Sequence, residues 1–286
     1  MIKNKIIISD VTLRDGGFTC DFDWPIEFAQ EYYNLMCELG VSYVEMGYWK
    51  QTAKSKNRFF NLDIETVKEV TSEQGKNNVS VMIDYSHCSK DLNDYPTDNQ
   101  NEIKMIRMTC RKDMVKEGFD FAVKLKKHTN LEIAFNLFNT TNYTDDELNS
   151  ALDIVLDSDF DIIGFADTHG HLNLHKDIKR YEHFFKRIKD SGKNTCFHLH
   201  NHTGKAYMNY IKCLESHYVD FCDTSIMSRS NTLACSSCSR SSAFLSIATV
   251  SCCFAVFSAF PYAFLSSTGR LPIRLSWRVR YPFRPI

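Results

Sequence analysis

Two histidines separated by one residue form the sharpest chemical feature of the 286-residue sequence. The segment reads His198-Leu199-His200, and alternate residues of a β-strand point to the same side of a sheet. If the segment is a strand, both imidazoles lie on one face, about 6–7 Å apart along the chain. That spacing suits two neighbouring ligands of one divalent cation. The competing interpretation is a pair of polar residues on a solvated strand face, because a His-x-His motif alone is only a hypothesis.

A carboxylate near the start of the chain favours the metal interpretation. Residues 10–17 read Asp-Val-Thr-Leu-Arg-Asp-Gly-Gly, and they follow a short apolar run that is typical of a buried first strand. Two histidines and the carboxylate of Asp15 would leave coordination positions open for the oxygens of a substrate. Arg14 is either a salt-bridge partner of Asp15 or, beside a metal, a guanidinium that holds a carboxylate or an enolate oxygen.

Eight short β-rich apolar runs recur along residues 1–227 and must position these side chains. Their starts are spaced by roughly thirty residues, which is the scale of a βα unit. The expected strands cover 6–9, 41–46, 79–83, 103–108, 131–135, 161–166, 195–199 and 218–222. Helical patterns cover 25–39, 63–74, 112–128, 145–156, 175–191 and 203–216. The helix over 145–156 opens with a capping box, Thr144-Asp145-Asp146-Glu147.

Strands that alternate with helices predict a parallel sheet covered by helices. Eight strands favour a closed (β/α)8 TIM barrel over an open doubly wound sheet, which would carry a Gly-rich loop after its first strand. In a barrel, active sites lie at the carboxyl ends of the strands. Polar residues stand near those predicted ends, and packing alone does not explain them: Arg14, Asp15, Glu45, Asp84, Asn136, Asp167, Thr168, His198, His200 and Asp223.

Three motifs occur together in the order of one enzyme family. They are Asp10-Val-Thr-Leu-Arg-Asp-Gly16, Asp167-Thr-His-Gly170 and His198-Leu-His-Asn201. On these motifs, residues 5–231 resemble the pyruvate carboxyltransferase-like family of metal-dependent TIM barrels. That family includes 4-hydroxy-2-oxovalerate aldolases, to which the resemblance is strongest, hydroxymethylglutaryl-CoA lyases, and isopropylmalate or homocitrate synthases. The resemblance implies cleavage or formation of a C–C bond next to a 2-oxo acid, through a pyruvate-type enolate.

The resemblance also implies a metal and its ligands. The cofactor is expected to be a divalent metal, Mn²⁺ or Mg²⁺, with Zn²⁺ as a further candidate. Asp15, His198 and His200 match the family's ligand positions. Asn231 is a candidate for a further metal-site residue, although the glycines of the family's Gly-x-Gly-x-Gly-Asn loop are missing around it.

Substrate and catalytic roles are assigned with less guidance from the motifs. Arg14 matches the family residue that stabilises the enolate and binds substrate. Thr168 matches a position that contacts substrate, and Asn136 at the end of the fifth strand is a further substrate-binding candidate. The aldolases carry a catalytic His shortly after the first motif, but this chain reads Gly-Phe-Thr-Cys over 17–20. The catalytic base is therefore not assigned to one residue. The candidates lie near predicted strand ends, where burial could tune their pKa: Glu45, Tyr48 and His87.

The chain changes character near residue 228. Residues 1–227 hold all 35 acidic residues and 27 of the 34 Lys and Arg, whereas 228–286 hold seven Arg and no acidic residue. Few strong helix formers and no Glu–Lys pairs make that region a poor source for the barrel's last helix. We predict a catalytic barrel over 1–227 and an atypical tail over 228–286, incomplete as a fold, out of frame or disordered. A rival interpretation is a genuine basic end that binds an anionic partner.

Composition sets the remaining expectations. With 43% hydrophobic and 24% charged residues, the chain resembles a globular protein, and a net charge of −1 argues against nucleic-acid or membrane-surface partners. The uncharged run 243–265 is long enough for a membrane span, but its serines argue against one. Cysteines scattered singly over 1–227 and the lack of a signal-peptide core favour the cytoplasm.

The expected partner is a small 2-oxo acid, and a homo-oligomer is left open. Two alternatives to an aldolase stay open as well. One is a Claisen-type acyltransferase of the isopropylmalate or homocitrate synthase kind, and the other is a degenerate barrel that binds metal or a partner without turnover.

Overall fold

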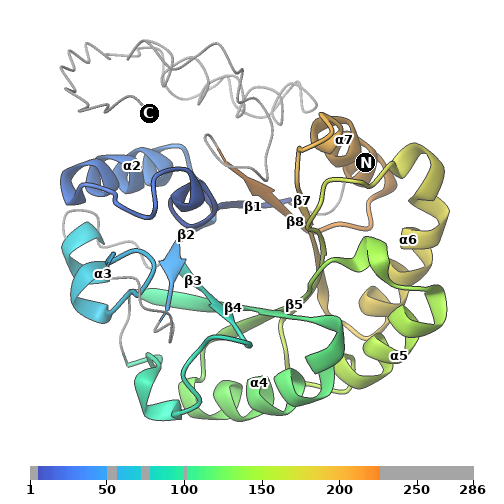
Figure 1. Cartoon of the computed structure of the whole chain (residues 1–286), viewed down its shortest axis with the longest axis horizontal. Coiled ribbons are helices and arrows are strands. Elements are labelled where there is room, and N and C mark those ends of the chain that lie inside the picture. The colour runs from blue at the N-terminus through green and yellow to red at the C-terminus, as the bar shows by residue number, and fades with distance from the viewer. Residues whose placement is uncertain (1–5, 50–56, 72–77, 100–101, 226–286) are drawn as a thin grey trace. The chain divides into compact units, whose positions relative to one another are not determined.

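The structure is a computed structural model, and it describes residues 6–49, 57–71, 78–99 and 102–225. Eight parallel strands pair in chain order and close into a barrel, in which the last strand pairs with the first (Figure 1). They are β1 (Ile7–Asp10), β2 (Tyr43–Tyr48), β3 (Val79–Asp84), β4 (Ile103–Cys110), β5 (Glu132–Leu137), β6 (Ile162–Asp167), β7 (Asn194–Leu199) and β8 (Phe221–Thr224). The predicted TIM barrel is confirmed, and the doubly wound sheet is excluded.

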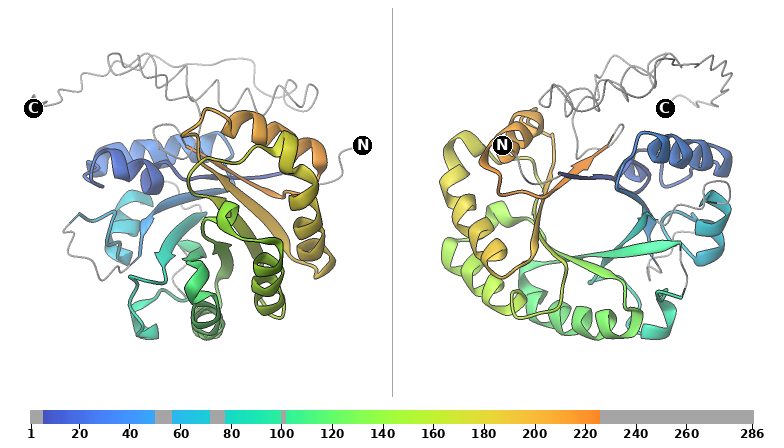
Figure 2. Two further views of the ribbon diagram at one scale, coloured as in Figure 1. Left: turned by 45° about the vertical axis from the view of Figure 1, so that its right-hand side comes forward. Right: turned by 180° about the vertical axis from the view of Figure 1, so that it is seen from behind.

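Six helices lie outside the ring of strands in the described part of the chain, as the turned views of Figure 2 show. They are α2 (Ile26–Glu38), α3 (Ile64–Thr71), α4 (Val115–Thr129), α5 (Asp145–Val155), α6 (Leu174–Asp190) and α7 (Ala206–Ser216). The predicted capping box is present, since the Thr144 hydroxyl accepts from the Glu147 amide and the Glu147 carboxylate accepts from the Thr144 amide. A further one-turn helix, α1 (Thr12–Asp15), follows β1 directly and was not predicted.

The barrel interior is built in layers. A separate apolar cluster consists of buried side chains from five strands, joined by two half-buried side chains from β1 and β2: Met105, Ala134, Ile162, Cys196 and Phe221, with Ile7 and Tyr43. Side chains from seven different strands can meet only inside the barrel, so this cluster is an interior layer. Residues two positions further along each strand face the same way and form the next layer. That layer is polar, with Glu45, Arg107, Asn136, His198 and Asp223 all buried.

Of the polar residues predicted at strand ends, Asp84 and Asp167 do end their strands, and others occupy different positions. Glu45 and Asn136 lie within their strands, two residues above the apolar layer. Arg14 and Asp15 lie on α1 instead of the end of β1, because the chain turns into a helix after Asp10. His200 lies one residue beyond β7, so only His198 of the pair is a strand residue.

Several predictions concern residues outside the described ranges. Asn231, the boundary expected near 228 and the apolar run 243–265 all fall within 226–286, and they stay predictions. In the described part of the chain, no helix combines the length and apolarity needed to cross a membrane.

Candidate metal centre

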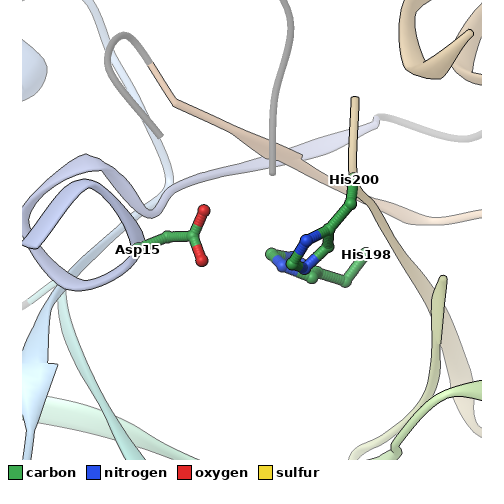
Figure 3. Close-up of side chains that lie close together, drawn as sticks. All are labelled: Asp15, His198 and His200. Atoms are coloured by element: carbon green, nitrogen blue, oxygen red, sulfur yellow. The ribbon is translucent and has the colours of Figure 1, made fainter. Parts of the chain in front are cut away.

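Asp15, His198 and His200 meet at the carboxyl end of the barrel, where the Asp15 carboxylate faces the two imidazoles (Figure 3). One potential ligand atom of each residue lies within 4.8 Å of the other two. Asp15 and His198 are buried and His200 is half-buried. Among the residues that the structure describes, no other group of three His, Cys, Asp or Glu side chains has this geometry.

Helix α1 places Asp15 at this point, and three neighbouring side chains fix the helix. The Asp10 carboxylate accepts hydrogen bonds from the amide and hydroxyl of Thr12, at 3.0 and 3.1 Å. The Tyr32 hydroxyl reaches the Thr12 hydroxyl at 2.8 Å, and the Trp24 indole donates to the Leu13 carbonyl at 2.9 Å. These bonds hold the first two residues of a helix that would be too short to be stable alone.

Asp223 orients the imidazole of His198. Nδ1 of His198 lies 2.6 Å from Oδ2 of Asp223, so the ring donates through Nδ1 and leaves Nε2 for a cation. Burial favours the neutral acid, but Arg107 and His198 together hold the pKa of Asp223 well below its usual value. The carboxylate is therefore charged at neutral pH, which fixes the tautomer of His198.

His200 is held in the form that binds metals. Burial lowers the pKa of His200 to about 3, with a further contribution from neighbouring His198, although Asp15 opposes the shift. The imidazole is thus neutral at neutral pH and keeps a lone pair for coordination. Its Nδ1 lies 3.4 Å from Nε2 of the exposed His202. One carboxylate and two imidazoles form a donor set that fits a divalent cation.

Arg14 lies beside this donor set and is buried. Its Nη1 donates to Oδ1 of Asp15 at 2.9 Å, and its Nε donates to Oε1 of Glu45. The guanidinium carbon also lies 5.9 Å from the ring centroid of Tyr48. Burial raises the pKa of Tyr48 to about 12 even though Arg14 lowers it, so this phenol is protonated at neutral pH.

The remaining predicted site residues, Asn136, Thr168 and His87, contact strands or loops of the barrel instead of the donor set. Asn136 is 3% exposed, and its Nδ2 reaches the Ala134 carbonyl at 3.5 Å. The Thr168 hydroxyl accepts from the Asn139 amide at 3.0 Å, which ties the loops after β5 and β6 together. His87 is exposed, with Nδ1 3.1 Å from Oδ2 of Asp84.

Sequence reasoning missed Arg107 and gave Asp223 no role. Arg107 is 3% exposed and pairs with both Glu45 and Asp223 inside the barrel. A signal was present, because Arg107 is a charge flanked by Met105, Ile106 and Met108 within the strand IKMIRMTC. Such a charge must find partners when it is buried.

Comparisons with known proteins agree with this geometry. The HMGL-like family model matches residues 5–217. A search of curated proteins finds no significant match. One similar solved structure is the N-terminal domain of a "putative aldolase" from Bacteroides vulgatus, with a TM-score of 0.62, 18% identity, and coverage of 89% of this chain and 88% of that one. An HMG-CoA lyase from Bacillus subtilis has a TM-score of 0.61 and 16% identity, with coverage of 78% of this chain and 77% of that one.

A third structure is the carboxyl transferase domain of Rhizobium etli pyruvate carboxylase, with a TM-score of 0.57 and 18% identity over 79% of this chain and 40% of that one. At these identities the structures establish the shared barrel fold. The family model, in contrast, spans the strands and loops that carry Asp15, His198 and His200. The resemblance seen in the three sequence motifs is therefore confirmed at the level of the family, and the chain belongs to the HMGL-like family.

Proposed function

We propose that the chain is a divalent-metal-dependent lyase that cleaves, or in reverse forms, a C–C bond next to a 2-oxo acid. The substrate class that we propose is a 4-hydroxy-2-oxo acid, as for 4-hydroxy-2-oxovalerate aldolases. The observation that carries this proposal is the convergence of Asp15, His198 and His200, with the guanidinium of Arg14 bound to Asp15. Membership of the HMGL-like family supports the same chemistry.

The three converging side chains would hold the metal. Mn²⁺ or Mg²⁺ suits the carboxylate, and the two imidazoles also suit Zn²⁺. Asn231 stays our proposed further ligand. When bound, the ion would act as a Lewis acid and as a template for the oxygens of the 2-oxo acid.

Arg14 is proposed to stabilise the oxygen that becomes negative in the enolate. A buried guanidinium already held by its neighbours needs no reorganisation during the reaction, which is the basis of electrostatic catalysis. Glu45 supplies that hold, because its Oε1 accepts from Nε of Arg14 and its Oε2 lies 3.1 Å from Nη1 of Arg107. We therefore propose that Glu45 acts mainly by fixing Arg14.

Proton transfer is proposed to involve Tyr48. Its hydroxyl is protonated at neutral pH, so it suits the donation of a proton to the methylene carbon of the enolate. A different group must take the proton of the substrate's 4-hydroxyl. His87 stays the candidate for that base, because the Glu45 carboxylate is already held by two guanidiniums.

Asn136 and Thr168 are proposed to bind substrate. The carboxamide oxygen of Asn136 is buried in the polar interior layer and has no hydrogen-bond partner among the described residues. Buried polar atoms are normally paired, so an orphan in this layer indicates a missing ligand or water.

The direct test is turnover by the full chain. Metal-free protein would be supplied with Mn²⁺, Mg²⁺ or Zn²⁺ and with 4-hydroxy-2-oxovalerate, and pyruvate release would be measured, with His200→Ala as the control. We expect metal-dependent release that the control lacks. Metal binding without turnover of any 4-hydroxy-2-oxo acid would overturn the proposal in favour of a degenerate barrel. Release of free CoA thiol from acetyl-CoA and a 2-oxo acid would instead identify an acyltransferase.

A further inference from the structure

A continuous line of buried side chains connects two of the three candidate metal ligands through the barrel interior. Every member is 7% exposed or less. In order, the line is Asp15, Arg14, Glu45, Arg107, Asp223 and His198.

Each link in this line is an ion pair or a charged hydrogen bond. From the Asp15 side, Arg14 binds Asp15 at 2.9 Å and also binds Glu45. From the His198 side, Oδ2 of Asp223 lies 2.6 Å from Nδ1 of His198 and 2.7 Å from Nη2 of Arg107. Arg107 closes the line with an ion pair that lacks hydrogen-bond geometry, since its Nη1 lies 3.1 Å from Oε2 of Glu45.

Arg107 joins the two halves of this line, because it pairs with both Glu45 and Asp223. It lies on β4, two residues above Met105 of the apolar interior layer, and it contacts the carboxylates of β2 and β8. A buried guanidinium is costly to desolvate unless it is paired. Its planar fork can hold two carboxylates at once, which an ammonium group does less well.

The charges of the line also favour a cation at its ends. The guanidiniums of Arg14 and Arg107 face the carboxylates of Asp15, Glu45 and Asp223. Counted without the imidazoles, three carboxylates face two guanidiniums, so the line carries one more negative group than positive groups. A buried excess of negative charge is stabilised by a bound cation.

We propose that Arg107 is the positioning residue of the metal centre. It holds Asp223, which fixes the tautomer and direction of His198, and through Glu45 it holds Arg14 and Asp15. One side chain that does not belong to the donor set thus sets the separation between Asp15, on the helix after β1, and His198 on β7. This inference rests on the proposed function, because it assigns Arg107 to the same metal centre.

The test compares Arg107→Met and Asp223→Asn with a control pair in which one residue lies on α6 and the other just before β8. Lys189 and Asp220 form an ion pair of 2.6 Å, and Asp220 stands three residues before Asp223 and is buried. Lys189→Met and Asp220→Asn therefore remove similar bonds away from the donor set. The Mn²⁺ dissociation constant of each metal-free full-length variant would be measured by calorimetry, and the His198 tautomer by nitrogen NMR.

We expect Arg107→Met and Asp223→Asn to weaken Mn²⁺ binding about 10–100-fold, the usual effect of removing a partner of a metal-binding histidine. The control pair should leave the dissociation constant unchanged. In metal-free protein, both site variants should shift His198 from a single Nδ1–H tautomer to a mixture. Arg107→Lys keeps the charge and replaces Arg107→Met in the test if that variant does not fold. It too should give a mixture of His198 tautomers.

Folded Arg107 variants with the parent's affinity and a single His198 tautomer would overturn the inference. Equal losses in the control pair would do the same, because they would show a general effect of stability. If the parent chain binds no divalent metal, the proposed function fails. The tautomer measurement on metal-free protein still decides the role of Arg107 in that case.

Discussion

His200 and His202 lie two residues apart, but only His200 belongs to the donor set. His202 is exposed and contacts His200 from the side opposite to a cation bound at Nε2. We predict that His200→Ala weakens metal binding by more than about 100-fold, because loss of a ligand should cost more than loss of a residue that only orients a ligand. His202→Ala should have a much smaller effect. Equilibrium dialysis with metal analysis would measure both, with circular dichroism to confirm folding. Equal effects of the two variants would contradict the assignment of His200.

Gly164 makes room for Asn136 in the polar layer. A Cβ added at Gly164 would lie 2.1 Å from Oδ1 of Asn136, a distance that no packing tolerates. We predict that Gly164→Ala destabilises the chain by about 1–3 kcal/mol, the usual cost of overpacking, and raises KM for the 2-oxo acid by displacing Asn136. Urea unfolding and steady-state kinetics would measure the two effects.

A double variant separates the clash from other causes. Asn136→Ala removes the atom that the new methyl group would meet, so Gly164→Ala should cost less in that background than in the parent. Additive costs would mean that the contact between Gly164 and Asn136 does not explain the loss of stability.

The three candidate ligands could be predicted from the sequence, but the buried ion pairs that connect them could not. Asp15, His198 and His200 lie in local motifs that adjoin strands, and a barrel brings such residues to one end. The pairing of Arg107 with Asp223 joins residues 116 positions apart, on strands that are not neighbours in the sheet. That pairing depends on the stagger of strands around the closed barrel, which no local pattern encodes. For the same reason, the sequence offered Glu45 as a base, whereas its contacts are with two guanidiniums.

At the scale of elements, the hydrophobic pattern of the sequence was sufficient to predict the strands but not to predict α1. Every predicted strand starts within three residues of an observed one, because buried parallel strands are continuous apolar runs bounded by polar residues. Helix α1 has four residues, fewer than are needed to show a helical repeat. Its existence depends on a local bond from Asp10 to Thr12 and on tertiary bonds from Tyr32 and Trp24, which a local sequence pattern does not encode.

The junction between β1 and α1 predicts a pH dependence of stability. Burial raises the pKa of Asp10 from 3.8 to about 6, although hydrogen bonds from Thr12 oppose the shift. The folded state therefore binds this proton more tightly than the unfolded state, so protonation of Asp10 stabilises the fold. The stabilisation is complete below about pH 4 and is lost as the pH rises through 6.

Asp10→Asn isolates this contribution. The amide keeps an acceptor for the Thr12 amide and does not titrate. We predict that the free energy of unfolding of the parent falls relative to that of the variant between pH 4 and pH 6, by up to about 3 kcal/mol. Urea unfolding of both proteins across this range would measure the difference. A difference that stays constant with pH would show that Asp10 does not titrate there.

At the scale of the whole barrel, the apolar layers and the candidate metal centre occupy different places. The interior apolar layer, with Met105 and Phe221, lies toward the amino ends of the strands. The larger cluster packs strands against helices, with Phe165, Phe197 and Tyr181 at contact distance from one another. The donor set lies at the opposite end of the strands, at their carboxyl ends. Burial of apolar surface, rather than metal coordination, should therefore supply most of the folding free energy.

This separation predicts that the metal-free barrel stays folded and that metal adds stability by mass action. A ligand that binds only the folded state stabilises it by about 2.7 kcal/mol at a free concentration 100 times its dissociation constant. Thermal unfolding of chelator-treated protein should be cooperative, and its midpoint should rise with added Mn²⁺. In His200→Ala the midpoint should not respond. Unfolding on chelation alone would show that the barrel needs the ion to fold, and an equal response in His200→Ala would place the binding site away from the candidate metal centre.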